Sequence, residues 1–254
     1  MAKYFVLLLV CLFGSFAAGT STPVLVELFT SEGCSSCPPA DALLQNLDRT
    51  QPLEGAQLIV LSEHVTYWNH DGWVDRYSSD QLTGRQADYV KHFGVDGSYT
   101  PEMVVDGETE FVPGNAAKTQ QALEKARSEP KLAVRVPSVS IASPDTIKAR
   151  VEVDALPDSF NVRKAEVYVV VALRQAESQV AHGENGGKHL SHVNVVQKLT
   201  KIGNVEKGKS FADDVQLKLA AGDDPSNIRV IAFVQQPGPG KILGSTMVDA
   251  VSAH

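Results

Sequence analysis

The chain runs VLVELFTSEGCSSCPP over residues 24–39, an apolar stretch that ends in Cys-x-x-Cys and two prolines. Residues 24–29 predict a buried strand, and residues 38–48 predict a helix with the prolines in its first turn. This order places Cys34 and Cys37 at the N-terminus of a helix. Backbone N–H groups and the helix dipole favour a thiolate there, so the pair is the first candidate for chemistry.

The N-terminal 19 residues have the layout of a secretory signal peptide. Lys3 supplies the positive charge, residues 4–16 are mostly apolar, and small residues follow at positions 17–20. The apolar run is too short to span a membrane comfortably, although a retained anchor is the alternative. We therefore expect residues 1–19 to be removed and the mature protein to be secreted or periplasmic. Cys11 leaves with this segment, so Cys34 and Cys37 are the only cysteines of the expected mature chain.

Composition excludes several functional classes. The formal net charge is −7, and it becomes −8 when Lys3, the one charged residue of the expected signal, is removed. No stripe of Lys and Arg suggests a nucleic acid partner. The chain also lacks a nucleotide-binding glycine loop, a His-Glu-x-x-His zinc motif and a Gly-x-Ser-x-Gly elbow. We therefore predict no cofactor and no metal, and no membrane contact after signal cleavage.

The two halves of the chain differ in their patterns. Residues 22–129 alternate strand-like and helix-like segments in the order β-α-β-α-β-β-α. Residues 131–254 contain short strands rich in Val, Ile and Leu, separated by Pro, Gly and Asp turns. The boundary falls at Pro130, since a helix ends before proline. The pattern of the second half predicts a β-sandwich of immunoglobulin-like architecture.

The element order of the first half resembles the thioredoxin fold. Thr100-Pro101 precedes the predicted hairpin strand, where thioredoxin-like proteins carry a cis-proline facing the cysteines. Glu27 resembles the buried acid of thioredoxins, with one extra residue before Cys34. The predicted fold class is therefore an α/β thioredoxin-like domain followed by an all-β sandwich-like domain. An ordinary trans proline and a solvent-facing Glu27 are the alternatives.

The resemblance implies a role for each of these residues. Cys34, expected to be the more exposed sulfur, would attack a substrate disulfide as a thiolate, and Cys37 would resolve the mixed disulfide. Glu27, if buried, would exchange a proton with Cys37. Thr100 and Pro101 would bind substrate beside the cysteines. The dipeptide between the cysteines is Ser-Ser and not Gly-Pro, so the direction of electron flow stays open.

A polar and aromatic stretch, EHVTYWNHDGW, occupies residues 63–73. It follows the second predicted strand and should emerge on the face that carries the cysteines. His64 and Trp68 are therefore candidate substrate-binding residues, and a histidine close to Cys34 would stabilise its thiolate. Alternatively, the aromatic side chains only cover a long loop.

The segment ELFTSEGCSSCPPAD, residues 27–41, is similar to the signature of a secreted thioredoxin-like family, domain of unknown function 1223. HVTYW at 64–68, YTP at 99–101 and GENGGK at 183–188 are similar to the later motifs of that family. The resemblance covers nearly the whole mature chain and implies fold and export more than a reaction. The segment 183–192 either packs over the cysteine face or is an ordinary hairpin between two strands.

The leading hypothesis is an exported thiol–disulfide oxidoreductase that acts on protein thiols and disulfides with a redox partner. One alternative is a copper-handling protein that uses both cysteines with His64 or His70. The other is a non-catalytic secreted binding module in which Cys34 and Cys37 form a permanent structural disulfide.

Overall fold

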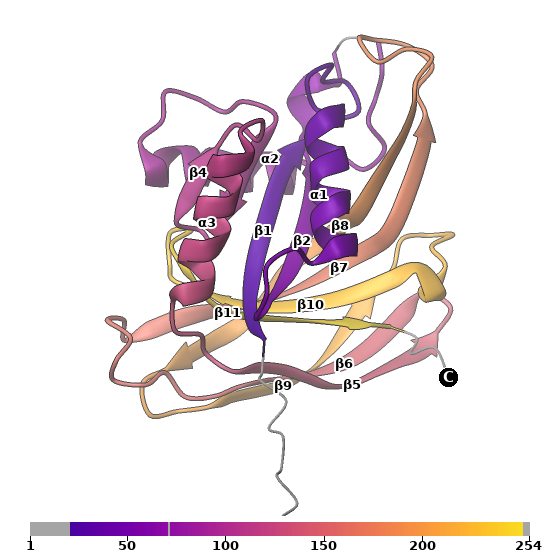
Figure 1. The fold of residues 1–254 in the computed structure, drawn as a ribbon. Helices are drawn as coiled ribbons and strands as arrows, with labels where there is room; N and C mark the ends of the chain where they lie inside the picture. Colours follow the sequence, from indigo (N-terminus) through magenta and orange to yellow (C-terminus); the bar gives the residue numbers. More distant parts are fainter. Residues whose placement is uncertain (1–20, 71, 251–254) are drawn as a thin grey trace, which may run out of the picture.

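The structure is a computed structural model that describes residues 21–70 and 72–250. The expected signal peptide, residues 1–19, lies outside these ranges. Within them the chain forms eleven strands, three α-helices and two 3-10 helices (Figure 1). In chain order the elements are β1 (Thr22–Thr30), α1 (Pro38–Thr50), β2 (Ala56–His64), η1 (Thr66–Trp68), α2 (Asp80–Phe93), β3 (Glu102–Val105), β4 (Thr109–Phe111), α3 (Ala116–Ser128), β5 (Val134–Ser143), β6 (Thr146–Val153), β7 (Lys164–Gln179), β8 (His189–Glu206), β9 (Phe211–Lys218), η2 (Pro225–Asn227), β10 (Ile228–Gln235) and β11 (Ile242–Asp249). No helix in the described ranges is both long and apolar enough to span a bilayer.

Local signals set the ends of the three helices. α1 begins directly after Cys37, with prolines in its first turn. The side chain of Ser79 caps α2 by accepting a hydrogen bond from the N–H of Leu82, and Gly94 ends that helix with a φ of 69°. Asn115 caps α3 in the same way as Ser79 caps α2. These caps lie where the sequence pattern predicts helix boundaries.

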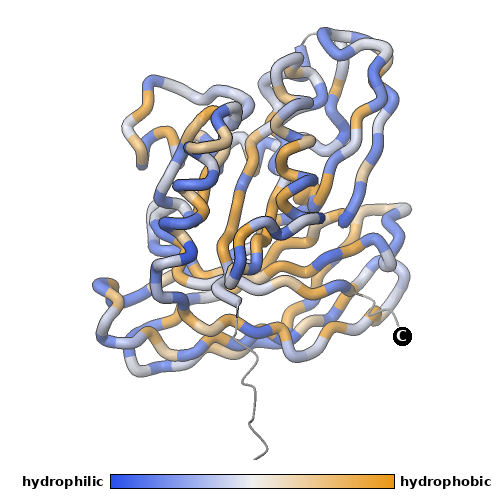
Figure 2. Tube along the Cα trace, in the orientation of Figure 1, coloured by the Kyte–Doolittle hydropathy of each residue, from blue (hydrophilic) through white to orange (hydrophobic). Residues whose placement is uncertain are grey.

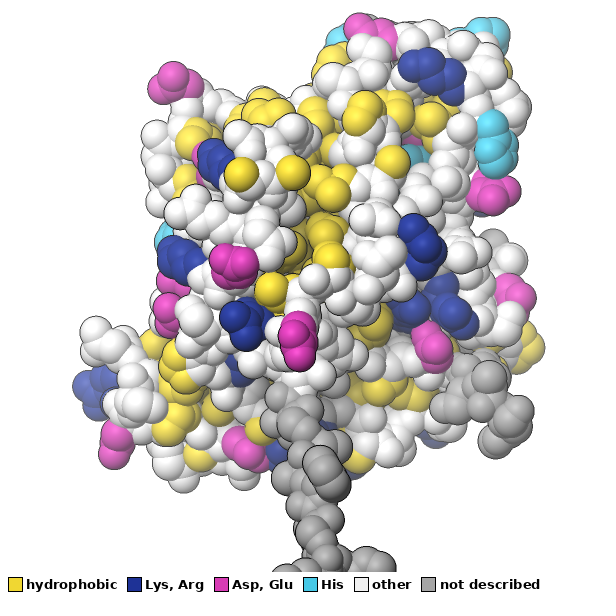
Figure 3. All heavy atoms as spheres, in the orientation of Figure 1, with side chains coloured by type: hydrophobic (Ala, Val, Ile, Leu, Met, Phe, Trp, Pro, Cys, Tyr) yellow, Lys and Arg dark blue, Asp and Glu magenta, His cyan; other side chains and the backbone are white. Residues whose placement is uncertain are grey.

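The two faces of the first-half sheet carry different helices. β1 is parallel to β2 and antiparallel to β3. Side chains alternate along a strand, so Val26 and Leu28 pack with α1 and α3, while Leu25 and Phe29 pack on the α2 side. Figure 2 shows hydrophobic residues along β1 between the helices, and Figure 3 shows hydrophobic side chains in a strip between α3 and α1.

The predicted fold class is wrong, because the first-half sheet continues into the second half. One mixed sheet has the strand order β11-β10-β7-β8-β2-β1-β3-β4. β8 joins β2 through a parallel pairing of Ser62 with Val195. The chain is therefore mostly β, with a single large sheet instead of an α/β thioredoxin-like domain followed by a separate sandwich.

The physical reason is that the first-half strands are apolar on both faces. Leu25 and Leu61 on the α2 side form one buried cluster with Val170 of β7 and Phe233 of β10. Long strands from the second half therefore cover surface that α2 alone leaves open. Local sequence patterns do not predict that strands of the second half pack against the first-half sheet.

The remaining strands form a second layer. β5, β6 and β9 make a three-stranded sheet that packs on β7 and β10 through Val151, Val169 and Val230, among others. The second half thus has two layers, but one of them is the continuation of the first-half sheet. The predicted domain boundary, at residues 129–131, lies between α3 and β5 and stays a prediction.

Candidate functional site

Cys34 and Cys37 form a disulfide at the start of α1, with a Cα–Cα distance of 5.4 Å. The turn is held by backbone hydrogen bonds, from the N–H of Cys34 to the carbonyl of Ser31 and from the N–H of Cys37 to the carbonyl of Cys34. Both cysteines are fully buried, whereas Ser35 and Ser36 are exposed. The expectation that Cys34 is the more exposed sulfur is therefore not met.

Few backbone donors are left for a thiolate at this helix end. Pro38 and Pro39 carry no N–H, and the first N–H groups of α1 bind the carbonyl of Cys37. The N–H of Ser35 is bound to Oε2 of Glu184 at 3.1 Å. The helix dipole remains, but the carboxylate of Glu184 sits beside the cysteines and opposes a second negative charge.

Glu184 belongs to the hairpin tip, residues 180–188, which connects β7 and β8. The side-chain amide of Asn185 donates hydrogen bonds to the carbonyls of Glu32, at 2.8 Å, and Cys34, at 2.9 Å. Asn185 is fully buried, and Lys188 donates to its side-chain oxygen at 2.8 Å. Segment 183–192 was predicted either to pack over the cysteine face or to be an ordinary hairpin. In the structure the hairpin tip packs over the cysteine loop (Figure 1).

Trp68 lies between the cysteine loop and Thr100. Its indole N–H donates to Oγ1 of Thr100 at 2.8 Å. On the other side, a Cβ atom placed on Gly33 would lie 3.0 Å from the Cβ of Trp68. The Thr100–Pro101 peptide bond is cis, as predicted. Trp68, Thr100 and Pro101 are thus brought together beside the cysteines, and their predicted role in substrate binding stays a prediction.

His64 occupies a buried polar cluster and not the surface. Its Nδ1 lies 2.7 Å from Oδ2 of Asp75, and its Nε2 lies 3.2 Å from Oγ of Ser62. The same Asp75 oxygen accepts the N–H of Glu32 at 2.9 Å, which ties the cluster to the cysteine loop. The His64 side chain is fully buried and both ring nitrogens are engaged, so its predicted substrate contact is not supported.

His64 and Asp75 form a buried ion pair. Burial by itself would lower the pKa of His64, but the charge of Asp75 and the hydrogen bond to it raise that pKa overall. Burial would raise the pKa of Asp75, but the charge of His64 and hydrogen bonds from His64, Glu32 and Tyr77 lower it to about 2. The two shifts agree with a charged imidazolium beside a carboxylate.

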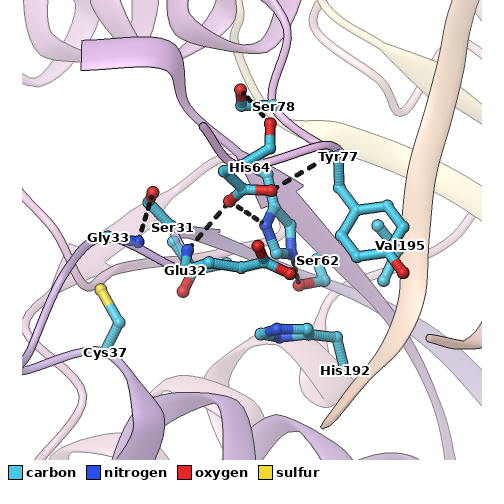
Figure 4. Close-up of polar contacts among 12 residues, drawn as sticks. Ser31, Glu32, Gly33, Cys37, Ser62, His64, Tyr77, Ser78, His192 and Val195 are labelled. Carbon is cyan, nitrogen blue, oxygen red and sulfur yellow. Dashed lines mark hydrogen bonds and ion pairs between the residues drawn. The ribbon is translucent and has the colours of Figure 1, made fainter. Parts of the chain in front are cut away.

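His192, from β8, lies against this pair (Figure 4). Its ring stands edge-on to that of His64, with centroids 4.6 Å apart, and Tyr77 contacts both rings. Nδ1 of His192 is 3.7 Å from Oδ1 of Asp41, and Asp41 accepts a hydrogen bond from Oγ1 of Thr30 at 2.9 Å. Neither ring nitrogen of His192 has a hydrogen-bond partner. Asp41 and Asp75 were not predicted as site residues, and His192 was a candidate only as part of segment 183–192.

Glu27 is buried, as the thioredoxin resemblance required, but it faces the other side of the sheet. Its carboxylate accepts hydrogen bonds from Nε of Arg85 and from the hydroxyl of Tyr89, each at 2.7 Å. Both partners belong to α2, whereas Cys37 precedes α1 on the opposite face. This position does not favour the predicted proton exchange between Glu27 and Cys37.

The copper alternative loses one of its two candidate histidines, because His64 uses both ring nitrogens inside the protein. Over residues 21–70 and 72–250, no group of three or more His, Cys, Asp or Glu side chains is placed to hold a metal ion.

Comparison with known proteins places the chain in a family. A family model described as "Protein of unknown function (DUF1223)" matches residues 25–235. The crystal structure of protein AGR_C_4864 from Agrobacterium tumefaciens is similar, with 25% identity and a TM-score of 0.71 over 92% of this chain and 97% of that one. HBP35 of Porphyromonas gingivalis is similar in fold, with 16% identity and a TM-score of 0.66 over 90% of this chain and 75% of that one. No curated protein matches the chain.

Proposed function

The chain belongs to the DUF1223 family, and from its own site we propose that it is an exported thiol–disulfide oxidoreductase that exchanges Cys34–Cys37 with protein thiols. The observation that carries this proposal is a disulfide between two residues separated by only two others, at the start of a helix. The family description contains no activity, and the cysteine site of this chain supplies the support for the proposal.

A permanent structural disulfide at this position would stabilise the fold only a little. In the chain-entropy picture, closing a loop of about four residues stabilises the fold by about 2 kcal/mol, against about 3 kcal/mol for a loop of 15 residues. The surrounding fold already has large buried clusters on both faces of its sheet. A pair at a helix N-terminus is better suited to exchange electrons, because the helix dipole favours the thiolate form.

The exchange takes two steps that balance. A partner thiolate attacks Sγ of Cys34, forming a mixed disulfide, and the Cys34–Cys37 bond breaks with its electron pair on Cys37. A second thiolate of the partner then attacks the partner sulfur of the mixed disulfide and releases Cys34. The partner is oxidised to a disulfide, and the two cysteines take up the two protons that the partner thiols lose. The reverse sequence reduces a partner disulfide.

The surface beside the cysteines supports a protein partner. Ser35 and Ser36 are exposed, and Trp68 and Thr100 are half-buried at one side of the loop. The buried sulfurs must become accessible, and the hairpin tip is the segment that covers the loop through Asn185. Access of a partner to Cys34 therefore requires the hairpin tip to move.

Export is part of the proposal. The apolar residues 4–16 and the small residues that follow support it, and a disulfide persists in an oxidising compartment. The mass of the protein purified from the exporting cell tests this part. Loss of the first 19 residues or so supports export, and an intact N-terminus contradicts it.

The reduction potential of Cys34–Cys37 tests the activity. The mature protein is equilibrated in glutathione or dithiothreitol buffers, and free thiols are trapped by alkylation. A potential above about −200 mV indicates an oxidising or isomerising pair, and one near about −270 mV indicates a reductase. Cys37→Ser should trap a mixed disulfide on Cys34, whereas Cys34→Ser should trap much less.

One observation favours the binding-module alternative. Both cysteines are fully buried, and Asn185 holds the loop around them closed. A potential below about −300 mV, with thiols that react slowly after reduction, supports that alternative and contradicts the oxidoreductase.

A further inference from the structure

His192 is an imidazole with unused hydrogen-bonding capacity inside the protein. Its side chain is fully buried, and neither ring nitrogen has a hydrogen-bond partner among the residues that the structure describes. Buried polar atoms are nearly always paired, so an unpaired buried imidazole calls for an explanation. A group that takes up and releases a proton during a reaction is one such explanation.

Among residues 21–70 and 72–250, the carboxylate that pairs with His192 is Asp41, which lies on α1, the helix that begins directly after Cys37. Asp41 is four residues after Cys37, and its N–H binds the carbonyl of Cys37 at 3.0 Å. Side chains four apart on a helix have Cβ atoms about 5–6 Å apart on one face. Asp41 is therefore one helical turn from Cys37 and 3.7 Å from His192, on the side of the sheet that carries α1 and opposite Glu27.

The charges around His192 oppose one another. Nδ1 of His192 lies 3.7 Å from the carboxylate of Asp41, and its ring centroid lies 4.6 Å from that of His64. Asp75 compensates His64, and Tyr77 packs against both rings. On the outer side, His192 lines an open pocket of about 760 Å³ that also holds the charged groups Asp48, Arg49, Arg174, Glu177 and Arg229. This pocket brings solvent next to residue 192, although both ring nitrogens of His192 are themselves buried.

We propose that His192, through Asp41, supplies the proton that Cys37 takes up when the disulfide is reduced and accepts it when the disulfide re-forms. This inference rests on the proposed oxidoreductase function. When a thiolate attacks Cys34, the S–S bond breaks and its electron pair stays on Cys37. The proton passes from the His192–Asp41 pair to that sulfur, and the pair is reprotonated from solvent. Oxidation reverses each transfer.

The test measures how fast dithiothreitol reduces Cys34–Cys37 between pH 5.5 and 8.5, with rates corrected for the thiolate fraction of the reagent. We compare His192→Gln and Asp41→Asn with wild type. His189→Gln is the matched control, because His189 lies on the same strand but is exposed and paired with Glu177. Loss of a proton donor should slow the corrected rate about 100-fold at pH 6 and flatten its pH profile. The control should keep the wild-type profile.

Two measurements separate this inference from a folding defect and from the proposed function. Circular dichroism and melting temperature show whether each variant is folded. If His192→Gln does not fold, the inference is tested with Asp41→Asn and with an NMR titration of His192 in oxidised and in reduced wild-type protein. An identical titration curve in the two states overturns the inference. A reducible wild type with unchanged variant profiles overturns the inference alone. A wild-type disulfide that no thiol reduces overturns the proposed function and this inference together.

Discussion

Asn185→Ala should release the hairpin tip and expose the disulfide. In the structure the Asn185 amide donates to the carbonyls of Glu32 and Cys34, at 2.8 and 2.9 Å. Within the described part of the chain, no other side chain of the hairpin tip donates to a carbonyl of the cysteine loop. Alanine removes both donors and leaves the backbone course of the hairpin unchanged.

The size of the effect follows from these two bonds. Each contributes about 1 kcal/mol net, so the closed position of the hairpin tip loses about 2 kcal/mol. Since 1.4 kcal/mol is a factor of ten, the open fraction should rise about 30-fold. The contact between Glu184 and Ser35 is exposed and adds little. A buried disulfide reacts through the open state, so the rate of reduction should rise by the same factor.

The assay is reduction by dithiothreitol under pseudo-first-order conditions at pH 7, followed by alkylation and mass spectrometry. Gln179→Ala is the matched control, because Gln179 is exposed and bonds only within the hairpin, to the carbonyls of Gly187 and Lys188. The control should react at the wild-type rate. An Asn185→Ala protein that is folded and reduced no faster than wild type would refute the reasoning that the hairpin tip controls access.

Five further substitutions test the buried charges and the packing around the site. Asp75→Asn removes the ion pair with His64; the fall of the Asp75 pKa from 3.8 to about 2 corresponds to about 2 kcal/mol. The stability that comes from the lowered pKa of Asp75 is present above pH 4 and is lost as the pH falls through 2. The stability that comes from the raised pKa of His64 is fully present below pH 6.5 and is lost as the pH rises through the pKa of His64 in the folded protein. Urea denaturation should therefore show the deficit of Asp75→Asn at pH 5, and an equal deficit at pH 2 would contradict it. Burial, then the charge of Glu27, raises the pKa of Glu63 well above its ordinary 4.5, so this group folds protonated, and its contribution is lost as the pH rises above 4.5. Glu63→Gln should match wild type at pH 4.5 and be more stable at pH 8, and a loss of stability by this variant at pH 8 would count against the reasoning. Glu27→Gln should be destabilised, because Glu63, at 3.6 Å, is then the remaining carboxylate beside the buried Arg85. Gly33→Ala places a Cβ atom 3.0 Å from Trp68 and should cost about 1–3 kcal/mol, while Gly84→Ala, which has open space within α2, should stabilise by about 0.5–1 kcal/mol. If the melting temperatures of Gly33→Ala and Gly84→Ala change in the same direction, the close contact with Trp68 does not determine the effect at Gly33.

Local chemistry explains what could be predicted from the sequence. The prolines after Cys37, the cap at Asn115 and the apolar run of residues 24–29 act over a few neighbouring positions, so they predict elements and their order. The cysteine pair at a helix start follows directly from that order. The cis bond at Thr100–Pro101 was predicted from family resemblance and not from residue physics, and the structure has it.

The face on which Glu27 lies shows the limit of such reasoning. Side chains alternate along a strand, so one extra residue before Cys34 moves an acid from one face of the sheet to the other. The resemblance to thioredoxins placed Glu27 by its distance in sequence from the cysteines. The register of β1 between β2 and β3 decides on which face of the sheet Glu27 lies. Glu27 consequently pairs with α2, and Asp41 and His192 occupy the side that carries Cys37.

The sequence by itself determined the Cys34–Cys37 turn, the helix that follows it, and the family. Only the tertiary structure decided that one sheet runs through both halves, that Asn185 covers the cysteine loop, and that His192 meets Asp41. Each of these contacts joins residues more than 100 positions apart. Such contacts depend on which apolar surfaces remain exposed after the local elements have formed and must be buried by other parts of the chain. No short sequence pattern predicts these long-range contacts.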